Sequence, residues 1–241
     1  MLKIGDKKLI NAWAFYDWAN SVYSLVISTA VFPLYYSAVT KDATVQFLGT
    51  DWDHPDTLYS YALSFSFLVV AFMSPILSGI ADYTGSKKKF MKFFCTLGSV
   101  SVMSLYFFDG IDTVWIGIVF TIFASIGFWA SIVFYNAYLP EVANPEQQDR
   151  ASAKGFMYGY FGSVLLLLLN LGMIMFPQVF GFDVSIDESI KLNGSELEIK
   201  KAIDEATAIA SSNASRVSFV LVGLWWIGFA QITFKRLPDD I

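Results

Sequence analysis

Long runs of hydrophobic residues, separated by short polar segments, follow one another along the whole chain. A helix needs about 17–25 predominantly apolar residues to cross a bilayer. The runs have this length, and none shows the period-two alternation of a half-buried strand. We therefore predict an all-α polytopic membrane protein with six spans, at residues 12–39, 58–81, 90–108, 113–139, 155–180 and 217–234.

The composition supports this prediction and excludes other classes of protein. Hydrophobic residues make up 55% of the 241 residues and charged residues 15%, whereas a soluble domain has about 25% charged residues. A net charge of −5 without an extended basic stripe argues against nucleic-acid binding. The expected surroundings of the chain are a lipid bilayer, and we expect no nucleic-acid partner.

The chemistry-bearing residues do not resemble an enzyme or metal site. The chain has one cysteine, Cys95, and one histidine, His54. These counts exclude an intrachain disulfide and a cysteine-based metal site. There is no glycine-rich phosphate loop and no nucleophile with a plausible base. We expect no catalytic residue, no metal ligand and no cofactor.

Lysine and arginine are unevenly divided between the segments that connect the predicted spans. With a cytoplasmic N-terminus, eleven of the 16 cations fall on the inner side. Cytoplasmic loops are the ones that carry excess Lys and Arg. We therefore expect a multi-pass protein of a bacterial inner membrane or a eukaryotic vacuolar-type membrane, with both ends of this chain cytoplasmic.

The longest polar segment, residues 181–216, connects the fifth and sixth spans on the extracytoplasmic side. Within it, Ser195–Ala210 combines helical spacing with good helix-forming residues. We predict a short amphipathic helix there, outside the membrane.

A carboxylate lies inside the first span. A charged group in the bilayer costs about 2.5–3.5 kcal/mol on insertion scales, so Asp17 needs an explanation. Polar residues follow it at helical spacing on the same face: Asn20 or Ser21, Ser24 and Ser28. Such a stripe indicates a water-filled path or a partner helix. Alternatively, Asp17 lies near the cytoplasmic surface and reaches water there.

The fourth span ends with a second polar group, Tyr135 and Asn136. At about 1.5 Å per residue, both lie at a depth similar to that of Asp17 if this helix starts outside. A hydrogen-bonded cluster with Asp17 and Asn20 would then form part of a substrate path. The equally open alternative is helix–helix hydrogen bonding, worth about 0.6 kcal/mol per bond.

Small residues recur every four positions in the fifth span, at Ala151, Gly155, Gly159 and Ser163. A ridge of this kind lets two helices approach closely in a membrane. We interpret these residues first as a packing face.

The segment between the second and third spans contains Asp82, Gly85 and three lysines that begin at Lys87. We expect Gly85 to form a tight turn. We also expect Asp82 to cap the next helix by accepting backbone N–H bonds. Contact with anionic lipid is the alternative; it explains the lysines but not the Asp–Gly spacing.

Four stretches resemble one family of transporters. Residues 82–88 are similar to the signature loop between helices two and three of the major facilitator superfamily. Residues 16–21, 134–141 and 155–162 resemble the autophagy-related vacuolar effluxer-like branch of that superfamily. Ser78 stands where the superfamily signature usually has glycine.

This resemblance implies a secondary transporter with two six-helix halves related by a pseudo-two-fold axis. In that fold the first and fourth helices line the substrate path, which would include the residues Asp17, Asn20, Ser24, Tyr135 and Asn136. Asp82, Gly85 and Lys87 would form the conformational signature loop. The expected partner is a small solute, with amino acids as one class.

Six spans make only the N-terminal half of such a fold. We expect this chain to be a fragment whose C-terminal half is missing; a second copy or a second polypeptide is the alternative. One half alone is not expected to transport. The rival function is a six-helix membrane interaction or receptor subunit without transport activity, which would use residues 181–216 as its binding surface.

Overall fold

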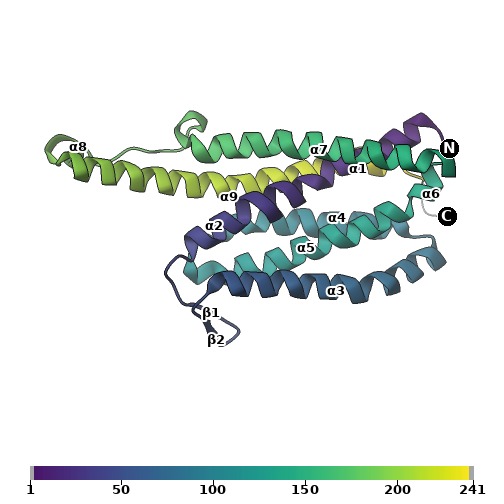
Figure 1. Cartoon of the computed structure of the whole chain (residues 1–241), viewed down its shortest axis with the longest axis horizontal. Coiled ribbons are helices and arrows are strands. Elements are labelled where there is room, and N and C mark those ends of the chain that lie inside the picture. Colours follow the sequence, from purple (N-terminus) through teal and green to yellow (C-terminus); the bar gives the residue numbers. More distant parts are fainter. Residues whose placement is uncertain (1–2, 239–241) are drawn as a thin grey trace.

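The computed structural model describes residues 3–238 and is an elongated bundle of long helices (Figure 1). In chain order the helices are α1 (Lys7–Val22), the π-helical η1 (Tyr23–Val31), α2 (Phe32–Val39), α3 (Pro55–Thr84), α4 (Lys87–Ser104), the 3-10 turns η2 (Leu105–Phe107) and η3 (Ile111–Thr113), α5 (Val114–Ala137), α6 (Leu139–Val142), α7 (Pro145–Met175), the 3-10 turn η4 (Pro177–Phe180), α8 (Glu188–Asn193) and α9 (Glu196–Arg236). Within the described residues, six helices are long and apolar enough to cross a membrane. The predicted all-α polytopic fold is confirmed.

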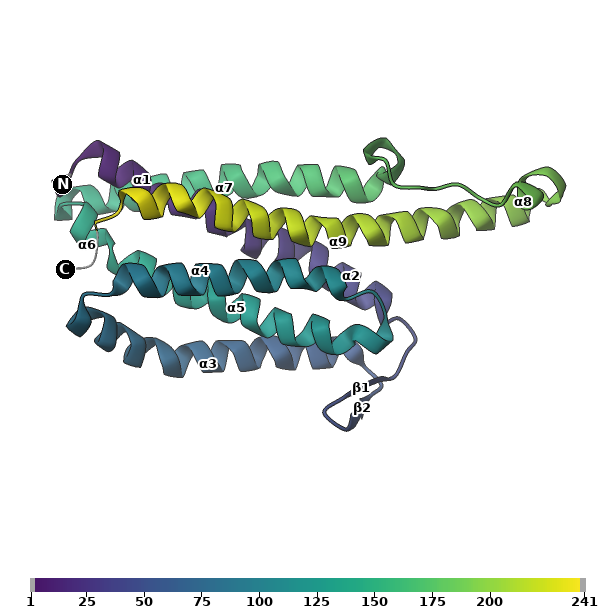
Figure 2. The same cartoon turned by 180° about the vertical axis from the view of Figure 1, so that it is seen from behind.

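The six long helices pack in two groups joined by α9. One group contains α1, α7 and α9, and the other contains α3, α4 and α5 (Figures 1 and 2). Helix α9 contacts both α1 and α4. Two hydrogen bonds fix it against α1: Thr233 Oγ1 donates to Ala12 O at 2.8 Å, and Trp225 Nε1 donates to Trp18 O at 3.0 Å.

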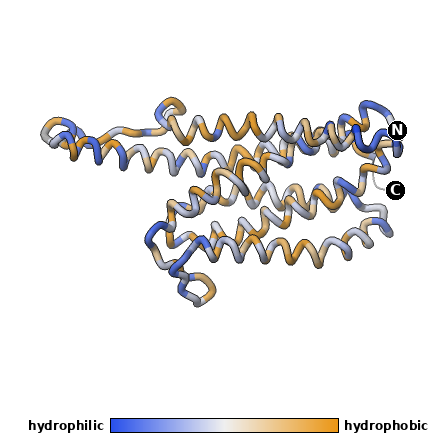
Figure 3. Tube along the Cα trace, in the orientation of Figure 1, coloured by the Kyte–Doolittle hydropathy of each residue, from blue (hydrophilic) through white to orange (hydrophobic). Residues whose placement is uncertain are grey.

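Apolar residues occupy the middle of the bundle and polar residues its two ends (Figure 3). Helix α3 is the least buried span; along its outer face Phe65, Leu68 and Phe72 are exposed. Large exposed apolar side chains in the middle of a span match a hydrocarbon environment or a second membrane domain.

The start of α1 and the end of α9 lie at the same end of the bundle (Figure 1). Gly5 N donates to Val142 O at 3.0 Å, which ties the start of the chain to α6. Lys88 Nζ donates to Leu237 O at 2.8 Å, which ties α4 to the residues after α9. The lysine-rich turn is therefore at the same end as both of these segments.

Helix α9 is much longer than the predicted sixth span. Ser195 caps its start by a reciprocal bond with Glu198, and residues 196–216 contain no Gly or Pro. The helix therefore continues without a break into the membrane, and the short amphipathic helix expected in this segment is its first part. Its 41 residues extend about 60 Å, twice the hydrocarbon thickness of a bilayer. The projecting part is visible at one end of Figure 2.

A small β-hairpin precedes α3, in a segment where we predicted only a connection. Strand β1 (Val45–Phe47) pairs antiparallel with β2 (Thr50–Trp52). The two turn residues, Leu48 and Gly49, have φ of 52° and 76°. Two consecutive positive φ values are typical of a type I′ turn, which matches the twist of paired strands.

Candidate solute cavity between α1, α5 and α7

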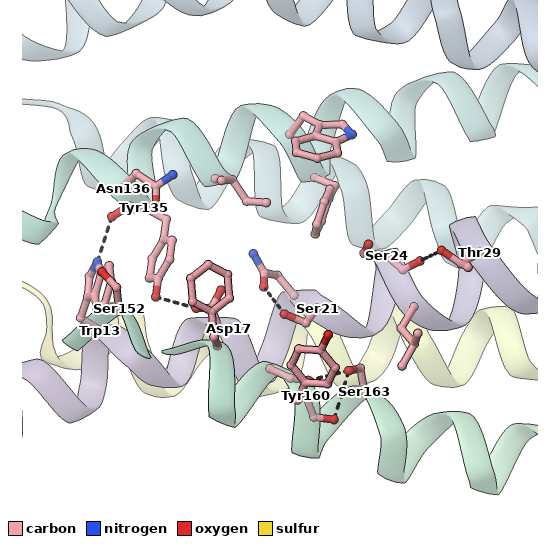
Figure 4. Close-up of a pocket in the computed structure, with 17 residues that line it drawn as sticks. Trp13, Asp17, Ser21, Ser24, Thr29, Tyr135, Asn136, Ser152, Tyr160 and Ser163 are labelled. Atoms are coloured by element: carbon pink, nitrogen blue, oxygen red, sulfur yellow. Dashed lines mark hydrogen bonds between the residues drawn. The ribbon is translucent and has the colours of Figure 1, made fainter. Parts of the chain in front are cut away.

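A cavity of about 550 Å³ lies between the first span, α5 and α7 (Figure 4). Such a volume is typical of a site for a small organic ligand. Its wall has polar members, Asp17, Asn20, Ser21, Ser24, Thr29, Tyr135, Asn136, Ser152, Tyr160 and Ser163, and less polar ones, Trp13, Leu25, Phe128, Trp129, Ile132, Phe156 and Gly159. All five predicted path residues, Asp17, Asn20, Ser24, Tyr135 and Asn136, are among them.

Asp17 and Tyr135 form a hydrogen bond between α1 and α5 across the cavity wall. The Tyr135 hydroxyl donates to Asp17 Oδ2 at 2.9 Å (Figure 4). Trp13 holds the tyrosine in place: its ring stacks on the Tyr135 ring with 4.3 Å between centroids, and its Nε1 donates to Tyr135 O at 2.9 Å. The predicted bond between the two polar groups is present, while Asn136 lies exposed on the same wall.

Asn20 lies one turn further along α1 and is 1% exposed. Its Oδ1 accepts a hydrogen bond from Ser21 Oγ at 3.4 Å. Its Nδ2 has no hydrogen-bond partner among the described residues. A buried amide donor without a partner is costly, so this position has unused hydrogen-bonding capacity beside the cavity.

The polar stripe on the first span continues differently from the prediction. Thr29 lines the cavity, and Ser28 does not. Between Tyr23 and Val31 the backbone is π-helical, with hydrogen bonds five residues apart instead of four. Thr29 Oγ1 accordingly donates to Ser24 O, five residues earlier, at 2.8 Å. The wider turn moves the polar position by one residue.

The small-residue ridge of α7 packs directly against the polar stripe of α1. A Cβ atom at Gly155 would collide with the Asp17 carboxylate, and one at Gly159 would approach Ser21 Oγ to 2.5 Å. Ser163 Oγ donates to Gly159 O at 2.6 Å. The ridge is a packing face, and Gly159 and Ser163 also line the cavity. The packing of α7 therefore determines where the Asp17 side chain lies.

The cavity wall formed by this chain carries negative charge only. Among the described residues that line it, Asp17 is the one carboxylate, and none is Lys, Arg or His. Lys154 on α7 does not line the cavity; its Nζ donates to Asn11 Oδ1 at 2.5 Å and lies 5.6 Å from the Tyr158 ring centre. In the described part of the chain, no three His, Cys, Asp or Glu residues are grouped to hold a metal ion.

The predicted signature loop lies outside the cavity lining. Gly85 ends α3 with φ of 60°, the left-handed conformation that glycine adopts readily. The prediction that Asp82 caps α4 is wrong, because α3 continues to Thr84 and α4 follows Ser86 without a side-chain cap. Asp82 Oδ1 instead lies 3.0 Å from Lys87 Nζ.

Lys87 has a second acidic partner that the sequence did not indicate. Its Nζ lies 2.8 Å from Oε1 of Glu141, which is in α6, the short helix that follows α5. We expect a coupling energy of about 0.5–1 kcal/mol for the Lys87–Glu141 pair, since exposed pairs contribute about 0.2–1 kcal/mol. We expect a smaller coupling energy between Lys87 and Asp82. The Asp82 side chain is 63% exposed, whereas the Glu141 side chain is 42% exposed.

The measurement is a double-mutant cycle on the free energy of unfolding in detergent. It uses Lys87→Met, Glu141→Gln and Asp82→Asn, alone and in pairs. A larger coupling to Asp82 than to Glu141 would contradict this ranking.

Several wall residues, including Trp129, Ser152, Phe156 and Tyr160, were not predicted. An aromatic residue on a spanning helix is equally compatible with contact with lipid, with the other helices or with a solute path. Helical spacing alone gives no signal that separates these cases.

Comparison with known proteins relates the chain to membrane transporters. Residues 5–151 match the family described as vacuole effluxer Atg22 like. An uncharacterized MFS-type transporter, YxiO of Bacillus subtilis (strain 168), is 32% identical over 216 residues, covering 90% of this chain and 43% of that protein. An uncharacterized protein of Aquifex aeolicus (strain VF5) is 24% identical over 200 residues, covering 80% of this chain and 48% of that protein. No solved structure matches.

The chain thus spans less than half the length of both curated relatives. The family match extends over α1 to α6 and the first residues of α7, and it includes Asp17, Tyr135 and the signature loop. The expected resemblance is confirmed, and the chain belongs to the vacuole effluxer Atg22-like family.

Proposed function

We propose that this chain is the N-terminal six-helix half of a secondary-active transporter for small solutes, and that α1, α5 and α7 form one wall of the solute path. The observation that carries the proposal is the position of Asp17. It lies within a membrane span and faces an open cavity lined by polar groups. Intramembrane carboxylates of this kind are typical of substrate or ion pathways.

The alternative reading, in which these polar groups only join helices, explains less of the wall. The Tyr135–Asp17 bond does join α1 to α5. Ser24 and Asn136, however, are exposed on the same wall. Polar side chains that served only to join helices would point at a neighbouring helix rather than into open space.

The second half of the transporter, from the same polypeptide or a second copy, would cover the cavity. Support comes from the relatives, which are more than twice as long as the matched part of this chain. Transport would then proceed by rocking of the two halves around the cavity. We propose that this chain alone does not transport, and that both of its ends, with the turn at Lys87, are cytoplasmic.

Thiol labelling tests whether the cavity belongs to a water-filled path. Ser24→Cys, in cells that produce the complete transporter, is expected to react with a charged, water-soluble methanethiosulfonate. The side chain at position 24 is exposed on the cavity wall. Within this chain the native Cys95 is fully buried, and the unmodified transporter, labelled in parallel, gives the background. The measurement is the rate of modification before membranes are solubilised.

Two matched variants serve as controls. Ser99→Cys lies in the core, where Ser99 is 0% exposed, and is expected to stay unmodified. Leu168→Cys lies on α7 outside the cavity lining, where Leu168 is 65% exposed; lipid or the second half should cover this position and exclude the charged reagent. If Ser24→Cys reacts no faster than these two controls, the proposed path does not exist.

The projecting part of α9 favours the second candidate, a membrane interaction or receptor subunit. Leu197, Ile203 and Ile209 are exposed along it, which suits a binding surface outside the membrane. The same labelling experiment separates the two candidates. A receptor without a solute path would leave Ser24→Cys as unreactive as Ser99→Cys.

A further inference from the structure

We infer that this cavity binds an organic ligand with a protonated amine and an uncharged oxygen next to it, such as an amino alcohol, and that it disfavours anions and zwitterionic amino acids. The inference rests on the proposed function, because it names the solute class of the same site. The ammonium group would lie against Asp17.

The first argument is the geometry of the carboxylate. Tyr135 donates to Asp17 Oδ2 and thereby fixes the direction of the carboxylate. The other oxygen, Oδ1, accepts no hydrogen bond from the described residues, and the carboxylate faces the cavity (Figure 4). The described wall residues include no Lys, Arg or His, so this half of the cavity supplies no cation to Asp17. A ligand cation would supply the missing counter-charge.

The second argument is the aromatic part of the wall. Trp13 and Tyr135 stack beside Asp17, and Tyr160 lies on α7 across from α5 (Figure 4). Trp129 and Phe156 also line the cavity. Aromatic faces attract cations, including ammonium groups, and they bury the apolar body of a ligand. Several aromatic rings around one acid are therefore suited to an amine with a hydrophobic side chain.

The third argument distinguishes an amino alcohol from an amino acid. Asn20 lines the cavity one turn from Asp17, and its buried Nδ2 has no partner among the described residues, so it would donate to a ligand oxygen once the side chain turns toward the cavity. A hydroxyl or carbonyl oxygen satisfies this donor without charge. A carboxylate at that position would lie close to Asp17 and would be repelled. The nearby cation that could offset the repulsion, Lys154, is directed at Asn11 instead.

Three ligands with the same phenyl group test the charge preference. Phenylalaninol is a cation with a neutral hydroxyl, phenylalanine is a zwitterion and 3-phenylpropionate is an anion. The measurement is the change in tryptophan fluorescence of the purified complete transporter in lipid nanodiscs at pH 7, since Trp13 and Trp129 line the cavity. We expect phenylalaninol to bind at least tenfold more tightly than the other two.

Two variants show whether Asp17 is the group that recognises the amine. Asp17→Asn is expected to weaken phenylalaninol binding at least tenfold. Asp112→Asn removes the same charge at an exposed position outside the cavity and should leave binding unchanged. Equal binding of phenylalanine, tighter binding of 3-phenylpropionate, or an Asp17→Asn variant that binds phenylalaninol normally would each overturn the inference.

A second measurement does not depend on purifying the chain. In Ser24→Cys, a cationic trimethylammonium-ethyl methanethiosulfonate should react at least tenfold faster than its anionic sulfonato-ethyl analogue, after each rate is divided by that with a free thiol in solution. Adding Asp17→Asn should remove the preference. Reaction with both reagents at equal normalised rates would overturn the amine inference and leave the path in place. Reaction with neither reagent would overturn the path itself.

Discussion

Asp17→Asn is expected to lower solute flux through the complete transporter by about a hundredfold. Asparagine has the same shape and still accepts the hydrogen bond from Tyr135, but it has no charge for a ligand cation or a coupling proton. Removing one partner of a desolvated charge pair costs about 2–5 kcal/mol, which corresponds to an effect of this size. The measurement is the initial rate of uptake or efflux of any small solute that the unmodified protein carries above background.

The control for this prediction is Asp112→Asn, which changes the net charge equally at an exposed position. Both variants should reach the membrane in the same amount as the unmodified protein, because the asparagine at position 17 is easier to insert than a carboxylate. Normal flux through Asp17→Asn would rule out a role for this carboxylate in transport.

Gly155→Leu is expected to destabilise the chain and to separate α7 from α1. Even a Cβ atom at this position would collide with the Asp17 carboxylate and would approach the Tyr135 hydroxyl to 2.8 Å. Overpacking of a close contact costs about 1–3 kcal/mol, and here the clash falls on the bond between Asp17 and Tyr135. The free energy of unfolding of the purified chain in detergent should fall by this amount.

Gly228→Leu is the matched control, because nothing lies within 4 Å of a Cβ atom at Gly228 in α9. Glycine is about 1 kcal/mol less favourable than alanine in a helix interior, so this control should be neutral or slightly stabilising. If the two substitutions lower stability equally, the close approach at Gly155 is not the cause of the effect.

The helices were largely predictable because a spanning helix has a strong hydropathic signal. What the sequence could not specify was where a helix continues outside the membrane. Ser195 and Glu198 begin α9 with a capping box, and the sequence contains both residues. Residues 196–216 contain no breaking residue, but this absence does not by itself distinguish one continuous helix from a separate helix followed by a span.

The candidate site was predictable where regular helical spacing holds. Asp17, Asn20 and Ser24 share one face, and the cavity contains all three. Regular helical spacing predicts Ser28 instead of Thr29, because no local sequence pattern indicates the π-helical segment. It also gave no indication of the contact between Lys87 and Glu141, which are 54 residues apart. Contacts of that kind follow from how α5 packs on α4 and so brings α6 to the start of α4.

The length of α9 has a mechanical consequence. Its membrane part is held against α1 and α4, while about 30 Å of the same unbroken rod extends beyond the bilayer. A tilt of about 10° at the membrane would displace the tip of such a rod by about 5 Å. A small rotation of the bundle would therefore displace the far end of α9 more than any part of the helix within the membrane.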